Sequence, residues 1–216
     1  VNWLRQFTLQ VIEVMDMLGL QQIAVEGESL GGWVALDLAI NFPERVSGVV
    51  LNTAWGIALD PTAVPEGETD LEALKATSLD ALENPTDATL RKRLEWLMPL
   101  GGVTDELIQL RKALWSQEPT RSALRDYYER LFAPDIASYY FDEAAIKTIQ
   151  CPTLVLWTDK NPIHGPDAAE RLHQLIQGSR LHIMEGCAHW PQWERPEEHD
   201  RVVKSFIETL GRRTTE

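Results

Sequence analysis

The stretch Gly27-Glu28-Ser29-Leu30-Gly31-Gly32 decides the fold, because it has the pattern of a sharp turn from a strand into a helix. An apolar strand-like run, 21–26, precedes it, and a helical pattern over 32–41 follows. The spacing G-x-S-x-G places a serine on such a turn, with glycines two before and two after to relieve crowded backbone. Ser29 then stands clear of the sheet as a candidate nucleophile. The backbone N–H of Leu30 lies at a helix N-terminus, where developing negative charge is favoured.

The rest of the chain divides into three parts around this turn. Residues 1–56 alternate helix and strand, beginning with an amphipathic helix over 1–18 and including a second strand at 49–51. Residues 57–145 lose all strand signals, and residues 146–216 resume the alternation with strands at 153–157 and 181–184. Alternation of this kind predicts an α/β fold with a mostly parallel sheet and flanking helices.

The middle part, 57–145, is expected to be an inserted all-helical unit. Leucines recur at helical spacing in four stretches, separated by prolines and glycines. The stretches run through 71–82, 90–97, 107–114 and 124–131.

Composition narrows the range of partners. Thirty-three acidic residues against 20 basic residues give a net charge of −13 among 216 residues, so a nucleic acid is not expected to bind. No apolar run reaches the ~18 residues that a membrane helix needs. Two cysteines form neither a disulfide framework nor a metal-ligand set and favour a reducing cytoplasm, so we expect no metal.

A serine nucleophile needs a base, and the position of His189 makes it the candidate. Of the five histidines, His173 and His199 fall in predicted helices and His182 falls within a strand. His189 instead follows the last predicted strand, in a loop at the carboxyl end of the sheet where α/β proteins place site residues. It also comes last in the chain, as the order nucleophile, acid, histidine requires.

The chain resembles the meta-cleavage product hydrolases of the α/β-hydrolase superfamily, which cleave carbon–carbon bonds in aromatic catabolism. The resemblance covers nearly the whole chain and makes 1–56 and 146–216 the hydrolase core and 57–145 its helical cap. Three segments carry it: 27–32, 103–111 (VTDELIQLR) and 186–194 (GCAHWPQWE).

The resemblance also implies that the chain is an N-terminally truncated fragment. Family members carry further strands before the first helix, and the loop that donates a second oxyanion N–H lies there. Without those N-terminal strands, the first strand here is expected to be an unpaired apolar edge, so we expect the chain alone to be poorly soluble.

The acid of the catalytic triad departs from the family pattern. The family places it as W-G-x-x-D after the strand matching 153–157, but the corresponding position here holds Asn161, and Asp159 stands two residues earlier. We favour Asp159. An altered site with Asn161 and an acid from elsewhere are the alternatives. The analogous asparagine in a serine protease lowers the rate ~10⁴-fold.

The resemblance implies a reaction that needs no cofactor. A 2-hydroxy-6-oxo-dienoate tautomerises to a ketone, and hydrolysis next to the 6-oxo group gives a carboxylic acid and a 2-hydroxydienoate. Ser29 is then the nucleophile and His189 the proton carrier. Arg111 matches the cap arginine of the family, and its guanidinium suits the substrate carboxylate. Trp190 is expected to line the same pocket.

Two other functions stay open. A carboxylesterase uses the same serine, base and oxyanion donors. A small-molecule-binding relative with little or no turnover is the second alternative, and Asn161 is the residue that supports it. The partner in each case is a small molecule. The sequence leaves the oligomeric state open, a homo-oligomer included.

Overall fold

The computed structural model describes residues 3–60 and 71–211. Helices and strands alternate in the first part and again in the last part, as predicted. The first part contains α1 (Leu4–Met17), β1 (Ile23–Glu28), α2 (Leu30–Asn41), the 3-10 turn η1 (Pro43–Arg45) and β2 (Val46–Asn52). The last part contains α7 (Glu143–Ile146), β5 (Thr153–Thr158), α8 (Pro166–Leu175), β6 (Arg180–Met184), α9 (Pro191–Glu194) and α10 (Pro196–Gly211).

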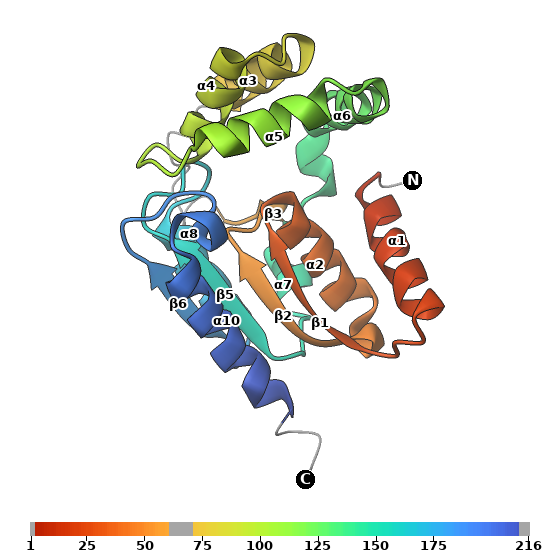
Figure 1. The fold of residues 1–216 in the computed structure, drawn as a ribbon. Coiled ribbons are helices and arrows are strands. Elements are labelled where there is room, and N and C mark those ends of the chain that lie inside the picture. Colours follow the sequence, from red (N-terminus) through yellow and green to blue (C-terminus); the bar gives the residue numbers. More distant parts are fainter. Residues whose placement is uncertain (1–2, 61–70, 212–216) are drawn as a thin grey trace.

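The four long strands form one parallel sheet in the order β1-β2-β5-β6 (Figure 1). β1 therefore lies at one edge of the described sheet. The predicted fold class, a parallel sheet with flanking helices, is confirmed. Because all four strands point the same way, the loops after their carboxyl ends gather at one edge of the sheet, and the residues of the site lie there.

Helices cover both faces of the sheet, which explains the uninterrupted apolar run of β5. Val155 and Trp157 face α2 and α8, in a cluster that includes Leu36 and Leu172. The intervening residues, including Leu156, face α10 in a second cluster. A central parallel strand buries both faces, so its sequence is apolar rather than alternating.

A partly buried ion pair joins α1 to α2. The Asp37 side chain is fully buried in α2, and its carboxylate accepts a hydrogen bond from Thr8 Oγ1 at 2.6 Å. Arg5 Nε lies 2.6 Å from the same carboxylate, and Asn41 Nδ2 donates to it at 2.9 Å. These donors compensate a charge that would otherwise be costly to bury.

The four predicted helical stretches form a separate layer above the carboxyl ends of the strands (Figure 1). They are α3 (Leu71–Glu83), α4 (Asp87–Leu97), α5 (Asp105–Trp115) and α6 (Glu118–Leu131). Residues 61–70 of the predicted cap lie outside the described residues. Inward leucines of this layer share one apolar cluster with Trp33 and Trp55 of the sheet layer.

A short strand pair at the base of the cap was not predicted. β3 (Ile57–Ala58) pairs in parallel with β4 (Phe141–Asp142), just after the 3-10 turn η2 (Ile136–Tyr139). The pairing brings together the two chain segments that enter and leave the helical layer. Within the described part of the chain, no helix is both long and apolar enough to cross a membrane.

Candidate active site

Ser29 lies on a strained turn between β1 and α2. Its backbone adopts φ 53° and ψ −114°, a conformation that non-glycine residues rarely adopt. A Cβ at Gly27 would lie 2.0 Å from the Gly31 carbonyl oxygen, and one at Gly32 would lie 2.4 Å from Ala54 Cβ. A Cβ at Gly31 would meet nothing within 4 Å. The prediction that the turn is crowded at Gly31 is therefore wrong, and the second crowded position is Gly32.

The backbone of the neighbouring strand holds the turn in place. The Ser29 N–H donates to the Asn52 carbonyl at 3.1 Å, and the Trp55 N–H donates to the Ser29 carbonyl at 2.9 Å. Leu30 opens α2, so its N–H lies in the first turn, where backbone donors lack intrahelical acceptors. An oxygen anion formed at Ser29 would be stabilised there.

His189 lies buried in the loop after β6, with 2% of its surface exposed. Hydroxyls at the ends of two strands hold this loop from below: Thr53 Oγ1 donates to the His189 carbonyl at 3.2 Å, and Thr158 Oγ1 donates to the Ala188 carbonyl at 2.6 Å. From the other side, the Glu194 carboxylate accepts from the N–H groups of Ala188 and Trp190, each at 2.9 Å. The imidazole therefore sits on a fixed backbone.

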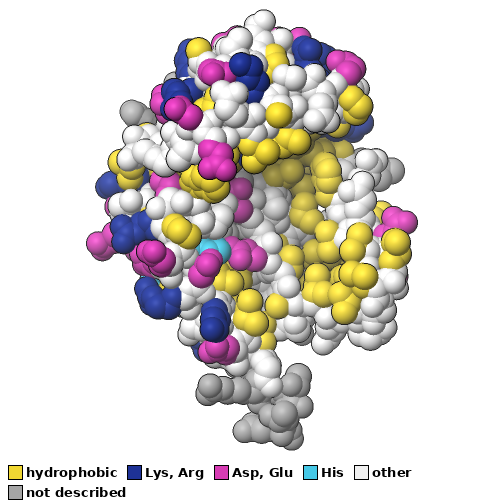
Figure 2. Space-filling model, viewed as in Figure 1, with side chains coloured by type: hydrophobic (Ala, Val, Ile, Leu, Met, Phe, Trp, Pro, Cys, Tyr) yellow, Lys and Arg dark blue, Asp and Glu magenta, His cyan; other side chains and the backbone are white. Residues whose placement is uncertain are grey.

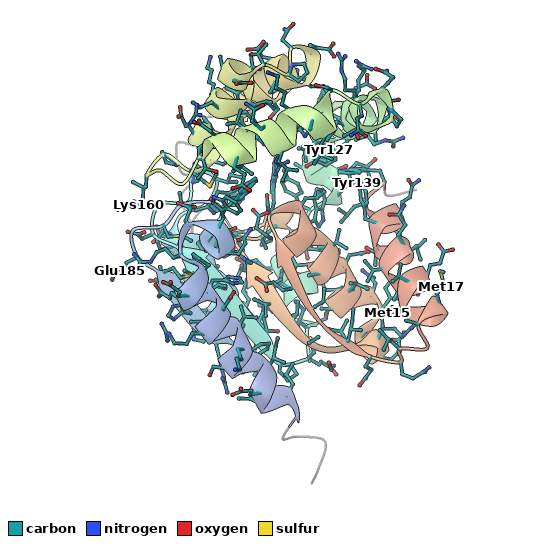
Figure 3. All side chains as sticks on the ribbon, viewed as in Figure 1. Met15, Met17, Tyr127, Tyr139, Lys160 and Glu185 are labelled. Carbon is teal, nitrogen blue, oxygen red and sulfur yellow. The ribbon has the colours of Figure 1, made fainter. Side chains whose placement is uncertain are left out.

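Asn161, and not the predicted Asp159, contacts His189. Asn161 Oδ1 lies 2.8 Å from His189 Nδ1, whereas Asp159 accepts from the Cys187 N–H at 3.3 Å and pairs with Lys160. The two residues are in one loop after β5, and the chain turns so that position 161 faces the imidazole. Figure 3 shows Lys160 on this loop, beside the loop that carries Glu185. The predicted contact between Asp159 and His189 is therefore wrong, and Asn161 makes that contact instead.

The contact with Asn161 fixes the tautomer of His189. Asn161 Oδ1 also accepts from the Ile163 N–H at 3.3 Å, which identifies the atom facing His189 as the amide oxygen. The His189 Nδ1 therefore carries a hydrogen, and Nε2 offers a lone pair. Burial lowers the pKa of His189 to about 3, and the nearby positive charge of Arg93 adds to the shift. At neutral pH the ring is uncharged and can accept a proton.

Glu28, inside the elbow motif, places a carboxyl group against the same imidazole. Its Oε1 lies 3.1 Å from His189 Nε2 but does not have hydrogen-bond geometry. Burial raises the pKa of Glu28 to about 8, although the positive charges of Arg93 and Arg111 oppose the shift. The carboxyl group is thus mainly protonated at neutral pH, so both groups are uncharged there.

Ser29 and His189 line one cavity of about 310 Å³ beneath the helical layer. Leu30, Trp55, Tyr127 and Trp190 line it as well. Figure 2 shows hydrophobic side chains gathered around the hollow between the helical layer and the sheet layer, and Figure 3 shows Tyr127 at the underside of the helical layer. The lining is therefore mostly apolar, with a few polar groups, as small-molecule sites commonly are.

Arg111 lies beside this cavity, in an adjoining recess of about 50 Å³. Its guanidinium stacks over the Trp190 ring, 5.1 Å from the ring centre, and burial lowers its pKa. Arg93 lines both the cavity and the recess. Among the described residues, no group of three or more histidine, cysteine or acidic side chains is arranged to hold a metal ion.

Sequence reasoning missed the positions of two residues at this site. Arg93 was not singled out, yet it lies three residues after the buried Leu90 on α4, a helical spacing that places it toward the cavity. Glu28 occupies a position that the elbow pattern leaves free, so no signal marked it. His199, predicted within a helix, is buried and bonds to Glu26 at 2.7 Å.

A strained serine turn after the first strand of a parallel sheet and a histidine in a late strand-end loop together define the α/β-hydrolase class. A family profile described as alpha/beta hydrolase fold matches residues 4–196, and the chain belongs to this family.

Comparison with individual proteins shows which hydrolases the chain is similar to. The chain is 33% identical over 206 residues to the 2-hydroxymuconate semialdehyde hydrolase of Pseudomonas putida, covering 91% of this chain and 66% of that one. The chain thus spans just under two thirds of the length of this curated relative.

This chain shares its fold with solved structures of two kinds of hydrolase. The meta-cleavage product hydrolase of Pseudomonas fluorescens superposes with a TM-score of 0.77 at 24% identity, covering 97% of this chain and 73% of that one. A putative lipase from Acinetobacter baumannii superposes with a TM-score of 0.79 at 20% identity, covering 97% and 69%. Likeness of fold alone therefore does not choose between carbon–carbon and ester substrates.

Proposed function

We propose that this protein is a serine hydrolase that cleaves a carbon–carbon bond in 2-hydroxy-6-oxo-dienoate ring-fission products of aromatic compounds. The observation that carries the proposal is the arginine recess that opens beside the cavity of Ser29 and His189. A dienoate carboxylate fits such a recess, whereas a simple ester has no group for it. Similarity to a 2-hydroxymuconate semialdehyde hydrolase supports the same substrate class.

In the proposed reaction, Arg111 binds the substrate carboxylate and Trp190 forms the wall behind it. The dienol first becomes a ketone by moving its hydroxyl proton to carbon, so that the ketone can receive the electron pair of the breaking bond. Ser29 Oγ then adds to the 6-oxo carbon while His189 Nε2 takes the hydroxyl proton. The N–H of Leu30 stabilises the oxyanion.

Cleavage of the carbon–carbon bond leaves an acyl group on Ser29 and releases the other fragment as a dienolate. His189 returns the proton that converts this fragment to the 2-hydroxydienoate. Water then hydrolyses this ester to the carboxylic acid. Asn161 keeps His189 in the required tautomer but supplies no negative charge. We expect turnover in the cytoplasm, on a soluble small molecule and without a cofactor.

The test follows both products of a ring-fission dienoate in ¹⁸O-labelled water. The proposal predicts a 2-hydroxydienoate without label and a carboxylic acid carrying label, and predicts that Ser29→Ala and His189→Ala each abolish both. Release of a labelled acid only from nitrophenyl esters would instead favour the carboxylesterase alternative. Tight binding of the dienoate without turnover would favour the non-catalytic relative, for which Asn161 is the supporting feature.

A further inference from the structure

Arg93 is a second guanidinium at the recess beside the catalytic cavity. It extends from α4, whereas Arg111 extends from α5, and both side chains line the same 50 Å³ space. Arg93 also lines the larger cavity together with Ser29 and His189. It therefore stands between the recess and the cavity.

The guanidinium of Arg93 is half-buried, and two of its nitrogens lack an acceptor. The Nε and Nη1 atoms are shielded from solvent and make no hydrogen bond, and no carboxylate of the described residues forms an ion pair with Arg93 or Arg111, although Glu28 interacts with both electrostatically. A guanidinium stays charged in proteins, and buried N–H donors without acceptors are unfavourable. By contrast Arg91, two residues earlier on the same helix, pairs with Asp105 at the surface.

We propose that Arg93 is a substrate-binding residue that grips the carboxylate of the substrate jointly with Arg111, and that this pair selects acids over neutral esters. The inference deepens the proposed function and rests on the same cavity. The volume of the recess fits one carboxylate, since a single water occupies about 30 Å³ of liquid. A carboxylate bound there leaves the rest of a dienoate chain in the cavity, where its distal carbonyl can meet Ser29.

The two arginines have different roles in this arrangement. Arg111 is oriented by its stacking on Trp190. Arg93 makes no such contact with the described residues, and its Nε and Nη1 atoms gain acceptors when a carboxylate binds. A carboxylate offers two charged acceptor oxygens, so the contribution of Arg93 to binding is expected to be larger for acids than for neutral ligands.

The probe is sorbate, a six-carbon dienoate without a 6-oxo group, compared with its neutral analogue sorbyl alcohol. Both are titrated by calorimetry into the wild type and into Arg93→Met, Arg93→Lys and the surface control Arg91→Met, with circular dichroism to check folding. We expect sorbate to bind the wild type more tightly than the alcohol. We expect Arg93→Met to weaken sorbate at least ~10-fold, Arg93→Lys less, and Arg91→Met not at all.

Equal sorbate affinity in folded Arg93→Met and wild type would overturn the proposal, as would equal wild-type affinity for sorbate and the alcohol. The measurement needs no turnover, so its outcome is separate from that of the proposed reaction. If the wild type binds sorbate through Arg93 but does not cleave dienoates, the recess is an acid-binding site of another hydrolase. If dienoates are cleaved while Arg93→Met binds sorbate normally, Arg111 alone binds the carboxylate.

Discussion

Replacing Asn161 with aspartate would put a carboxylate oxygen where the amide oxygen now lies, 2.8 Å from His189 Nδ1. When His189 takes the serine proton, the ring becomes a cation, and a neighbouring anion stabilises it. At this separation and an effective dielectric constant of about 20, the attraction has an upper limit of about 6 kcal/mol. Each 1.36 kcal/mol is about tenfold in rate, so the limit corresponds to about 10⁴-fold.

Burial of the new carboxylate offsets part of this gain, so we expect Asn161→Asp to raise kcat ~10²- to 10⁴-fold. The same charge raises the pKa of His189 from its value of about 3, which makes the ring a stronger base. The assay is the steady-state kcat for a nitrophenyl ester between pH 5 and 9, with Ser29→Ala as the blank, because it does not depend on the natural substrate.

Asp159→Asn is the matched control, since Asp159 is in the same loop but bonds to the Cys187 N–H. We expect it to change kcat by less than about threefold, because surface substitutions usually change free energies by no more than ~0.5 kcal/mol. A folded Asn161→Asp protein with unchanged or lower kcat would refute the reasoning. Loss of activity in Asp159→Asn would return Asp159 to the role of the acid.

Three further variants test the elbow, its carboxyl group and the support of α2. Gly27→Ala is expected to unfold the elbow or abolish activity, since the new Cβ would lie 2.0 Å from the Gly31 carbonyl oxygen; a folded, active variant in an activity and circular dichroism assay would contradict this. Glu28 has a folded pKa of about 8 against 4.5, so it lowers stability as pH rises from 4.5 to 8. Glu28→Gln should therefore raise Tm more at pH 8 than at pH 5, and parallel Tm curves would count against the shift. Asp37→Asn is expected to lower stability by about 1–3 kcal/mol in urea titrations, because it weakens the acceptor of the buried Thr8 hydroxyl and removes the anion that pairs with the partly exposed Arg5; a loss below about 0.5 kcal/mol would show that the pair is replaceable.

The sequence was sufficient to predict the fold because its signals are local and repeated. The glycine pattern around Ser29 requires a tight strand-to-helix turn, and the apolar run through Trp157 predicts a strand buried on both faces. Leucine spacing located the four cap helices to within a few residues. The β3–β4 pair was not predicted, because a strand of two residues is too short to show an alternation of apolar and polar residues.

Residues of the site were harder to predict wherever their role depends on contacts across the fold. Ser29 and His189 stand at strand ends, and this position is visible in the sequence. The choice between Asp159 and Asn161 depends on how one loop turns, which no local pattern encodes. Glu28 reaches His189 only because the ends of separate parallel strands meet at one edge of the sheet, and Arg93 reaches the recess only because the helical layer lies over that edge.

The most direct test of the proposed function compares kcat/KM for a ring-fission dienoate and for a nitrophenyl ester in the same preparation of the protein, with the Ser29→Ala variant measured in parallel. The dienoate is followed by loss of its visible absorbance and the ester by nitrophenol release. We predict faster turnover of the dienoate than of the ester, with Ser29→Ala inactive on both. Ester turnover without dienoate cleavage, or dienoate cleavage that survives in Ser29→Ala, would contradict the assignment of a serine-dependent carbon–carbon bond hydrolase.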